Sequence, residues 1–501
     1  MAGAGQSRFF KDAVTGDPRG IAFDTADPHE QLLISLIDTP AMARMGRILQ
    51  LGAKSTLIGA EHTRREHMIH AAALARYATA HLRRAMDRAQ PGLYDPRLGL
   101  ACMVACCLHD IGHPPLGHEF ETVAQRVSGR KFHHEDWSAR LIREDVHIQS
   151  CLQGFVTAHT GYAETFVADY GMTFDEMVVA LIEGKAPCEL AAYQSLVSGK
   201  IDCDRGSFLP IDRAQAQGVN LETELPDDLW ADIELAQVDG VTVIVHDRVK
   251  AEQFLMVWRE QYEKIYYVAG SDSKESMLAP ILHDFLQSAH TTLEHLSLEE
   301  MALYRVLSND GTASIRDYLM LDDRVIERVI ERAAESNPDP WVRRLAQGIM
   351  QDDILPSLDF SHLDKKHRDG LIRYLQTRLP EGVVDGTHIF VTNEKSRDVA
   401  KLHKAYGTPA FDDHHNVAYV RNATGNVVPV QHASTVIQGT PPLNAMYLHA
   451  EADVLYTLVP VINDYLAAAG YDDSIDAGSI LYHTGVRHWG AAGSAPAGVQ
   501  P

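Results

Sequence analysis

Apolar residues recur at helical spacing through most of the first 350 positions. Spacing of i, i+3, i+4 places apolar side chains on one face of a helix, which is then buried against other helices. Residues 29–350 are therefore predicted to be mostly helical. The clearest stretches are HEQLLISLIDTPAMARMGRILQLG (29–52), REHMIHAAALARYATAHLRRAMDRA (65–89), DEMVVALIEG (175–184), VKAEQFLMVWREQYEKIYYVA (249–269) and ESMLAPILHDFLQSAHTTLEHL (275–296).

The pattern changes after about residue 355. THIFVT (387–392) predicts a strand, and NVAYVRNATGNVVPV (416–430) predicts a hairpin with Ala423, Thr424 and Gly425 near its turn. The predicted fold class is mainly α, with a helical core and a smaller α+β C-terminal lobe. The predicted divisions are an N-terminal segment (1–20), a helical catalytic domain (21–350), the α+β lobe (351–488) and a disordered tail (489–501).

The charge balance limits the ligands. The 501-residue chain has 45 Lys and Arg against 68 Asp and Glu, a formal net charge of -23. An average surface of this sign repels polyanions, so nucleic acid is not expected as the main ligand. A small anion held by a few local Arg and Lys side chains remains compatible with it.

The cysteine pattern and the length of the longest apolar run indicate where in the cell the protein is found. No CxxC pair is present, which favours free thiols in a reducing compartment over a disulfide frame. The longest apolar run, Leu98–Leu108, is too short to span a bilayer, and MAGAGQSRFF lacks a signal pattern. A cytoplasmic protein without a membrane segment is expected. The six cysteines are Cys102, Cys106, Cys107, Cys151, Cys188 and Cys203.

The stretch HDIGHPPLGHEFE (109–121) follows the apolar run directly. It is open to three interpretations: a metal site, a catalytic acid/base cluster or a polar helix end. Pro114 and Pro115 stop the helix, while two glycines let the chain turn with three imidazoles close together. Adjacent His109 and Asp110 form a common ligand pair for a divalent transition metal. Two ligands are incomplete, so others must come from elsewhere in the chain.

Two other segments carry suitable ligands. HTRREHMIH (62–70) contains His67 and His70, which share roughly one helix face, and spacing alone does not choose between them. KIDCDRGSFLPID (200–212) contains Asp202, Asp204 and Asp212, and it reads either as an extended segment or as a helix start with an acidic cap.

The ordered set of His67, His109–Asp110 and Asp204 resembles the H…HD…D signature of the HD-domain phosphohydrolases. HDIGHPPLGHEFE looks like the HDIGHPPFGHxGE stretch of the deoxyguanosine triphosphate triphosphohydrolases and of the SAM-and-HD-domain deoxynucleotide triphosphohydrolases. The likeness extends, in family order, to IDTPAMARMGRILQLG, GAEHTRREH, FHHEDWSARLI, IDCDRGSFLPID and FDDHHNVAYVRNATGNVVPV.

The resemblance implies a role for each matching residue. His67, His109, Asp110 and Asp204 would be the metal ligands, with His70 a packing residue and Asp202 a supporting acid. The residues implied to act in catalysis are His118, paired with Glu121 as a general acid, together with His134 and His113. The residues implied to bind substrate are Gln50, Leu51, Arg64, Arg205, Asp212, Arg259 and Tyr267.

The resemblance also implies a reaction, hydrolysis of a deoxynucleoside triphosphate to a deoxynucleoside and inorganic triphosphate. It implies a divalent transition metal (Mn, Fe, Ni or Zn), Mg with the triphosphate, and a homo-oligomer, tetramer or hexamer. The alternatives are an HD phosphohydrolase acting on a monophosphate, an alarmone or a cyclic nucleotide, and a non-catalytic nucleotide-binding assembly. FDDHH (411–415) is not expected to bind a metal, because consecutive side chains converge poorly on one ion.

This chain departs from the family mainly where relatives bind a guanine activator. Asp38 is kept, but Ala43 and Gly46 stand where relatives have Gln and Arg, so a guanine-specific activator site is not expected. Arg8 and Lys11 remain candidates for contact with a nucleotide phosphate. Phe208 stands where many relatives have a tyrosine.

Overall fold

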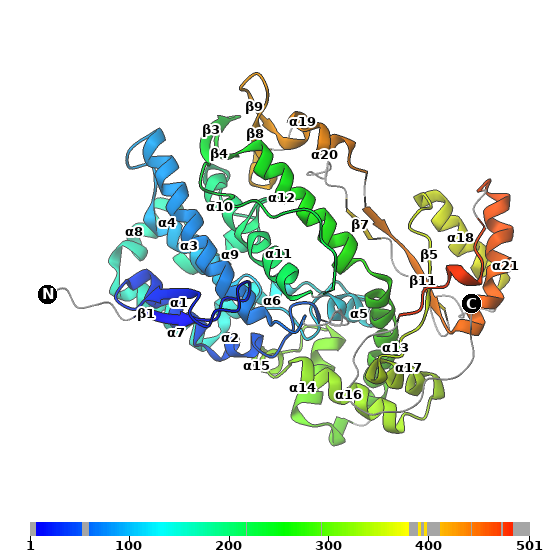
Figure 1. Cartoon of the computed structure of the whole chain (residues 1–501). Helices are drawn as coiled ribbons and strands as arrows, with labels where there is room; N and C mark the ends of the chain where they lie inside the picture. The colour runs from blue at the N-terminus through cyan, green and yellow to red at the C-terminus, as the bar shows by residue number, and fades with distance from the viewer. Residues whose placement is uncertain are drawn as a thin grey trace.

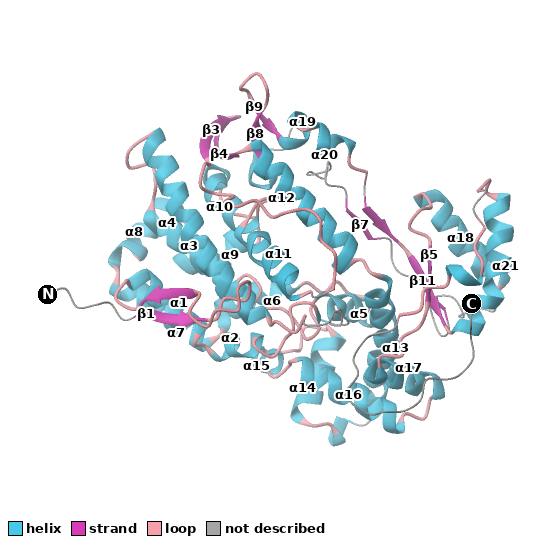
Figure 2. Cartoon of the chain, viewed as in Figure 1, coloured by secondary structure: helices cyan, strands magenta, loops and turns pink. Residues whose placement is uncertain are grey.

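Helices make up most of the protein, with small sheets at its edges (Figures 1 and 2). The predicted fold class, a helical core with a smaller mixed C-terminal region, is confirmed. The computed structural model describes residues 7–52, 60–216, 218–291, 293–379, 389–391, 395–397, 411–441, 443–471 and 474–483.

The N-terminal half begins with a hairpin, in which β1 (Ser7–Phe10) pairs with β2 (Ile21–Asp24), and continues as a set of packed helices. The helices are α1 (Pro28–Ile37), α2 (Pro40–Met45), α3 (Arg64–Ala89), α4 (Pro96–Leu108), α5 (His118–Ser128), α6 (His134–Glu144), α7 (Val146–Ala158), α8 (Glu164–Tyr170), α9 (Phe174–Ile182), α10 (Ala191–Ser198) and α11 (Cys203–Gln215).

Helix α4 is the centre of this half. Every residue from Leu98 to Leu108 is buried, since the helix is apolar on all sides and is surrounded by α1, α3, α9 and α10. Helix α3 begins with a capping box: Glu66 N donates to Thr63 Oγ1, and the Glu66 carboxylate accepts from Thr63 N at 2.8 Å. Helix α11 begins where Asp202 caps Arg205 N at 2.8 Å. These caps fix the first turns of α3 and α11, which pack against each other.

The next part of the chain covers one side of this core. One feature was not predicted: β3 (Glu234–Val238) and β4 (Val241–His246) form an antiparallel pair inside the span expected to be helical, where VTVIVH is rich in β-branched residues. The helices that follow are α12 (Arg248–Gln261), α13 (Ala269–Thr291), α14 (Leu298–Ser308), α15 (Ile315–Leu319), α16 (Asp323–Ser336) and α17 (Pro340–Gln351).

The C-terminal region divides between two packing partners. One part has its own apolar core around the antiparallel sheet β5-β11-β6. A second part returns to the helical core, where β8 pairs in parallel with β4 and Val420 and Val430 join the main apolar cluster. The elements are β5 (Ser357–Asp359), α18 (Lys365–Arg378), β6 (Ile389–Val391), β7 (Lys395–Arg397), β8 (Tyr419–Arg421), β9 (Val427–Pro429), α19 (Val430–Ala433), α20 (Thr435–Gly439), β10 (Leu443–Ala445), β11 (Tyr447–Ala450) and α21 (Ala452–Ala468).

The two strand predictions in this region are confirmed. Ile389–Val391 of THIFVT forms β6, and β8 and β9 form the expected hairpin, with Asn422 N donating to Asn426 O across the turn at 2.9 Å. The predicted disordered tail lies outside the described residues. Within the described part of the chain, each helix is too short or too polar to cross a bilayer.

Candidate active site

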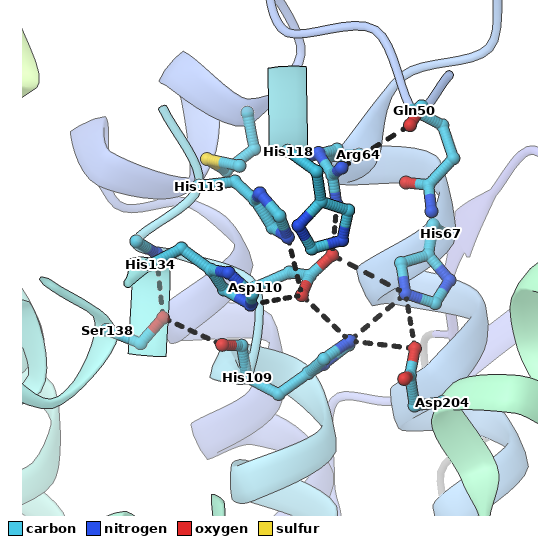
Figure 3. A network of polar contacts seen from close by, with 12 residues as sticks. Gln50, Arg64, His67, His109, Asp110, His113, His118, His134, Ser138 and Asp204 are labelled. Atoms are coloured by element: carbon cyan, nitrogen blue, oxygen red, sulfur yellow. Dashed lines mark hydrogen bonds and ion pairs between the residues drawn. The ribbon is translucent and has the colours of Figure 1, made fainter. Parts of the chain in front are cut away.

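Three helices bring the four predicted metal ligands together (Figure 3). His67 lies one turn into α3, His109 ends α4 with Asp110 after it, and Asp204 lies in the first turn of α11. His67 Nε2 lies 3.1 Å from His109 Nε2 and 3.1 Å from Asp204 Oδ1. His109 Nε2 lies 3.2 Å from Asp204 Oδ1 and 3.4 Å from Asp110 Oδ1. The predicted ligand set is therefore one cluster.

Hydrogen bonds behind the cluster fix which nitrogen of each imidazole points into it. His109 Nδ1 donates to the Cys106 carbonyl at 2.8 Å. Ser207 Oγ donates to the His67 carbonyl and lies 3.0 Å from His67 Nδ1, so it accepts from that nitrogen. On each ring, Nε2 is then the nitrogen that faces the cluster and could bind a metal. Partners of this kind orient metal-binding histidines.

The donor set fits a divalent cation. Neighbouring atoms held about 2.1 Å from one ion lie roughly 3.0–3.4 Å apart at octahedral or tetrahedral angles, and roughly 4.2 Å apart across an octahedron. The four distances above fall in the first range, and His67 Nε2 lies 3.9 Å from Asp110 Oδ2. Burial alone would lower the pKa of His109, but Asp110 and Asp204 raise it to about 10. The two carboxylates therefore make the centre of the cluster attractive to a positive charge.

Spacing could not choose between His67 and His70, but the structure does. His70 Nδ1 lies 3.0 Å from Ser207 Oγ, behind the cluster, and burial lowers the pKa of His70 to about 4. Asp202 likewise stays outside the cluster: it is fully buried, caps α11 and pairs with Arg205.

The chain turns sharply between the metal ligands and the predicted acid/base group. Leu116 has φ 59° and Gly117 has φ 62°, and α5 then starts at His118. Glu121, one turn into α5, lies 3.0 Å from His118 Nδ1 and 2.7 Å from His134 Nδ1. One carboxylate therefore holds two imidazoles, of which His118 is mostly exposed and His134 mostly buried.

The three imidazoles and Glu121 differ in charge. Burial would raise the pKa of Glu121, but hydrogen bonds from His118 and His134 bring it well below its usual range. Burial would lower the pKa of His134, but Glu121 and Asp110 raise it overall. Burial and then Arg64 lower the pKa of His113 well below its ordinary value. The surroundings therefore favour the protonated form of His134 and the neutral form of the neighbouring His113.

His113, His118, Glu121 and His134 are close enough to form a second ligand group. Their geometry favours proton transfer over metal binding. The His113 and His134 rings stack at 3.7 Å with an interplanar angle of 16°, so one ion could not lie in both ring planes. The Nδ1 atoms of His118 and His134 are already bonded to Glu121. This second set is therefore best described as an imidazole–carboxylate network.

The cluster opens on a cavity of about 550 Å³, a usual size for a small-ligand site. Asp110 and Asp204 line it from the metal side, and His113, His118 and His134 line it beside them. A π-helical turn at Tyr262–Tyr266 ends α12 and brings three tyrosines to the wall. The predicted substrate-binding residues that line the cavity are Gln50, Leu51, Arg64, Arg205, Asp212 and Tyr267.

The predicted cationic residues lie in different surroundings. Arg64 Nη1 lies 2.5 Å from Asp110 Oδ2, and its Nη2 donates to the Gln50 carbonyl at 3.4 Å. Arg205 pairs with Asp202 and lies over the Trp258 ring. Arg259 is not among the described residues that line the cavity, and it pairs with Glu263 at 2.9 Å.

Two partners of Asp212 were missed by sequence reasoning, His62 and the cavity-lining Tyr266. His62 Nε2 lies 2.6 Å from Asp212 Oδ1, and the Tyr266 hydroxyl donates to Asp212 Oδ2 at 2.5 Å. Both oxygens of this buried acid therefore have partners within the protein. The signal for Tyr266 was its place beside Tyr267, whereas no pattern linked His62 to an acid 150 positions away.

The N-terminal candidates contact acids of the same chain. Both guanidinium nitrogens of Arg8 bond Asp38, one of them at 2.6 Å, and Lys11 Nζ lies 3.3 Å from Glu66 Oε1. Contact of Arg8 or Lys11 with a nucleotide phosphate stays a prediction.

Curated proteins resemble this chain over different lengths. The uncharacterized protein YwfO of Bacillus subtilis is 26% identical over 66% of this chain and 69% of its own length. The uncharacterized MG461 homolog of Mycoplasma pneumoniae is 23% identical over 73% of this chain and 81% of its own. The deoxynucleoside triphosphate triphosphohydrolase SAMHD1 of Xenopus laevis is 37% identical, but over 24% of this chain and 18% of its own.

Solved structures share the fold over nearly the whole chain. A phosphohydrolase from Bacteroides thetaiotaomicron has a TM-score of 0.62 and 19% identity, and covers 89% of this chain and all of its own. A hypothetical protein from Aquifex aeolicus has a TM-score of 0.60 and 18% identity, and covers 92% of this chain and all of its own. The HD domain family matches residues 64–165, which include His67, His109 and Asp110. The chain therefore contains an HD domain.

Proposed function

We propose that this protein hydrolyses deoxynucleoside triphosphates to a deoxynucleoside and inorganic triphosphate. The observation that carries the proposal is the position of the ligand cluster: Asp110 and Asp204 form one wall of a cavity that Arg64, Arg205 and His118 also line. The partial similarity to proteins named deoxynucleoside triphosphate triphosphohydrolases supports the choice of substrate.

His67 Nε2, His109 Nε2 and the carboxylates of Asp110 and Asp204 would hold the metal ion. When bound, a divalent ion there polarises a phosphoryl oxygen and activates water. Nitrogen and oxygen donors together suit Mn, Fe, Ni or Zn, and Mg is expected to accompany the triphosphate.

Arg64 and Arg205 would bind the phosphates. Guanidinium stays charged and presents a planar fork of donors, which suits phosphate oxygens. Arg205 lies over the Trp258 ring and pairs with Asp202, so its head group is held in place before substrate arrives. That preorganisation lowers the entropy lost on binding.

His118 would give a proton to the leaving 5′ oxygen as the bond between that oxygen and the α-phosphorus breaks. Glu121 accepts from His118 Nδ1 at 3.0 Å, which leaves Nε2 free to donate. The side chain of His118 is 62% exposed and lines the cavity. Positioned acids of this kind typically contribute about 10²–10⁴-fold to the rate.

Leu51, Gln50 and Tyr267 would lie against the sugar. Leu51 belongs to an apolar cluster that also packs against Tyr267, and Tyr267 is tied to β11 by a hydrogen bond from the Tyr447 hydroxyl to its carbonyl at 2.8 Å. An apolar wall at this place disfavours a ribose 2′ hydroxyl, because the hydroxyl would lose water without gaining a partner.

Product analysis tests the proposal. The protein is incubated with each of the four deoxynucleoside triphosphates, singly and mixed, with Mn²⁺ or Mg²⁺, and the phosphate products are separated by ion-exchange chromatography. Inorganic triphosphate and deoxynucleoside in equal amounts are expected. Orthophosphate or pyrophosphate as the first product, or no product from any substrate or mixture, would show the proposal to be wrong.

A further inference from the structure

Asp323 links two segments of the cavity wall that are far apart in sequence. Its Oδ1 accepts a hydrogen bond from Leu116 N at 2.8 Å, and its Oδ2 accepts one from Leu49 N at 2.9 Å. Leu49 directly precedes Gln50 and Leu51, and Leu116 directly precedes Gly117 and His118. The same carboxylate therefore holds the predicted sugar-binding wall and the turn that carries the predicted proton donor.

The ordinary role of an acid at this position does not explain these contacts. Asp323 begins α16, where a negative charge commonly favours the helix dipole. Both of its oxygens, however, bond other segments rather than amides of its own helix. The residue is 5% exposed, and burial raises the pKa of its carboxyl to about 6. Burial disfavours the charged form of Asp323, so its two hydrogen bonds to backbone amides indicate that it positions the segments that carry them.

The two walls need such a link because they pack tightly and one of them is strained. Leu116 is a non-glycine residue with φ 59°, a backbone conformation that residues with a Cβ rarely adopt. A Cβ on Gly52 would lie 2.3 Å from the Leu116 carbonyl oxygen, so the walls touch at that point. On the cavity side they meet again at Arg64, which bonds the Gln50 carbonyl and whose Nη2 lies 2.7 Å from where a Gly117 Cβ would be.

The segment just before α16 also holds the same turn. The Tyr318 hydroxyl donates to the Gly112 carbonyl at 2.5 Å. Arg44, fully buried, donates from Nη2 to the His113 carbonyl at 2.8 Å and from Nε to the Leu321 carbonyl at 2.6 Å. Residues 318–323 therefore bond the backbone of the turn before and after its two prolines.

We propose that Asp323 is a positioning residue that sets the separation between the Gln50–Leu51 wall and the His118 turn. It touches no substrate itself. When the carboxyl is ionised, its two oxygens hold two backbone amides at once. The distance between these amides then sets the distance between the side chains of the two walls. The proposal rests on the proposed function for the identity of the substrate, but the contacts themselves do not depend on it.

Asp323→Asn tests the proposal with little change in volume. An Asn side chain keeps one acceptor oxygen, so one of the two amides loses its partner. Asp322→Asn is the matched control, since Asp322 is the adjacent residue and bonds Arg47 rather than either wall. Asp323→Ala serves as a second variant if Asn restores both contacts through water. All proteins are compared as full-length chains at equal metal content.

Two measurements are made. Hydrogen exchange followed by mass spectrometry should show the Leu49 or Leu116 amide exchanging about tenfold faster in Asp323→Asn, with no change in Asp322→Asn. Steady-state kinetics with a deoxynucleoside triphosphate should show KM raised and kcat lowered. Simple loss of folded protein would lower the apparent kcat and leave KM unchanged, so the rise in KM identifies positioning.

The proposal is overturned if neither amide exchanges faster in Asp323→Asn and Asp323→Ala, or if exchange rises while KM and kcat stay at wild-type values. Hydrolysis of bis(4-nitrophenyl) phosphate is measured in parallel. If the wild-type protein cleaves this ester but no deoxynucleoside triphosphate, the proposed function fails, and the fold-change in KM and kcat for the ester then decides the role of Asp323.

Discussion

Glu121 Oε1 lies 2.7 Å from His134 Nδ1 and accepts a second hydrogen bond, at 2.9 Å, from the backbone amide of the same residue. The contact with Nδ1 favours the protonated form of the ring, and the contact with the amide fixes the position of Glu121. His118 Nδ1 lies 3.0 Å from the other oxygen of Glu121, so one carboxylate holds two imidazoles at the cavity.

Replacing Glu121 with Gln should therefore shift the pH dependence of the reaction. Burial lowers the pKa of His134 and the carboxylate offsets this, so without the negative charge the pKa of His134 falls. His134, which is predicted to act in catalysis beside His118, then loses its proton at lower pH, so the alkaline limb of the kcat/KM profile should move to lower pH. We expect kcat to fall by about 100-fold. Glu135→Gln, which alters an exposed acid 3.4 Å from His134 Nδ1, should give a much smaller shift. Equal shifts in both variants would contradict the assignment.

Removal of the metal should lower the melting temperature. A ligand that binds the folded state alone stabilises it by about 2.7 kcal/mol at 100 times its Kd. Treatment with a chelator followed by addition of Mn²⁺ should lower and then restore Tm in the wild-type protein, but not in Asp204→Ala. His81→Ala is the control, since His81 is a buried histidine of α3 that bonds the Ala231 carbonyl instead. Wild-type metal content in Asp204→Ala would rule out this site.

Gly112 should tolerate no side chain. A Cβ there would lie 2.2 Å from Ser138 N and 2.4 Å from the His134 carbonyl oxygen, both of them backbone atoms that cannot move alone. Gly112→Ala should lower the free energy of unfolding by about 1–3 kcal/mol and impair activity. Gly154→Ala, in the exposed middle of α7 with nothing within 4 Å, should raise it by about 0.5–1 kcal/mol. Chemical denaturation measures both, and similar values for the two variants would show that Gly112 is not confined.

Arg205 and Arg259, both candidate phosphate-binding residues, should not contribute equally to substrate binding. Arg205→Gln should raise KM for a deoxynucleoside triphosphate by about tenfold, the loss expected for one charge-assisted contact. Arg259→Gln should change KM less than twofold, because Arg259 pairs with Glu263 and lies outside the cavity lining. Steady-state kinetics at fixed metal concentration checks both. Equal increases would mean that Arg259 leaves Glu263 to reach the substrate.

Helical periodicity was enough to predict the core, because one apolar face repeated over 300 residues has few other ways to be buried. The β3–β4 pair was missed because two short strands interrupt a long helical span, although VTVIVH (241–246) is rich in β-branched residues and β4 also pairs with β8. Spacing alone did not separate His67 from His70, and only the resemblance indicated His67 as the ligand. In the structure, His67 Nε2 lies 3.1 Å from His109 Nε2, whereas His70 Nδ1 lies 3.0 Å from Ser207 Oγ.

Long-range polar contacts could not be predicted from the sequence either. Asp212 was predicted to bind substrate, but its partners His62 and Tyr266 have no sequence pattern that links them to it. Asp323 is separated from Leu116 by 207 positions, and an acid at the start of a helix is too common to draw attention. Such contacts depend on how finished elements pack together.

The parallel pairing of β8 with β4 has a practical consequence for dissecting this protein. Residues 411–441 are late in the chain, yet Val420 and Val430 complete the apolar core built by the first half. A truncation at residue 350 would remove them and leave β4 with an open edge, which is a template for aggregation. A fragment that ends at residue 350 should therefore be less stable than the full chain, because part of its apolar core comes from this returning segment.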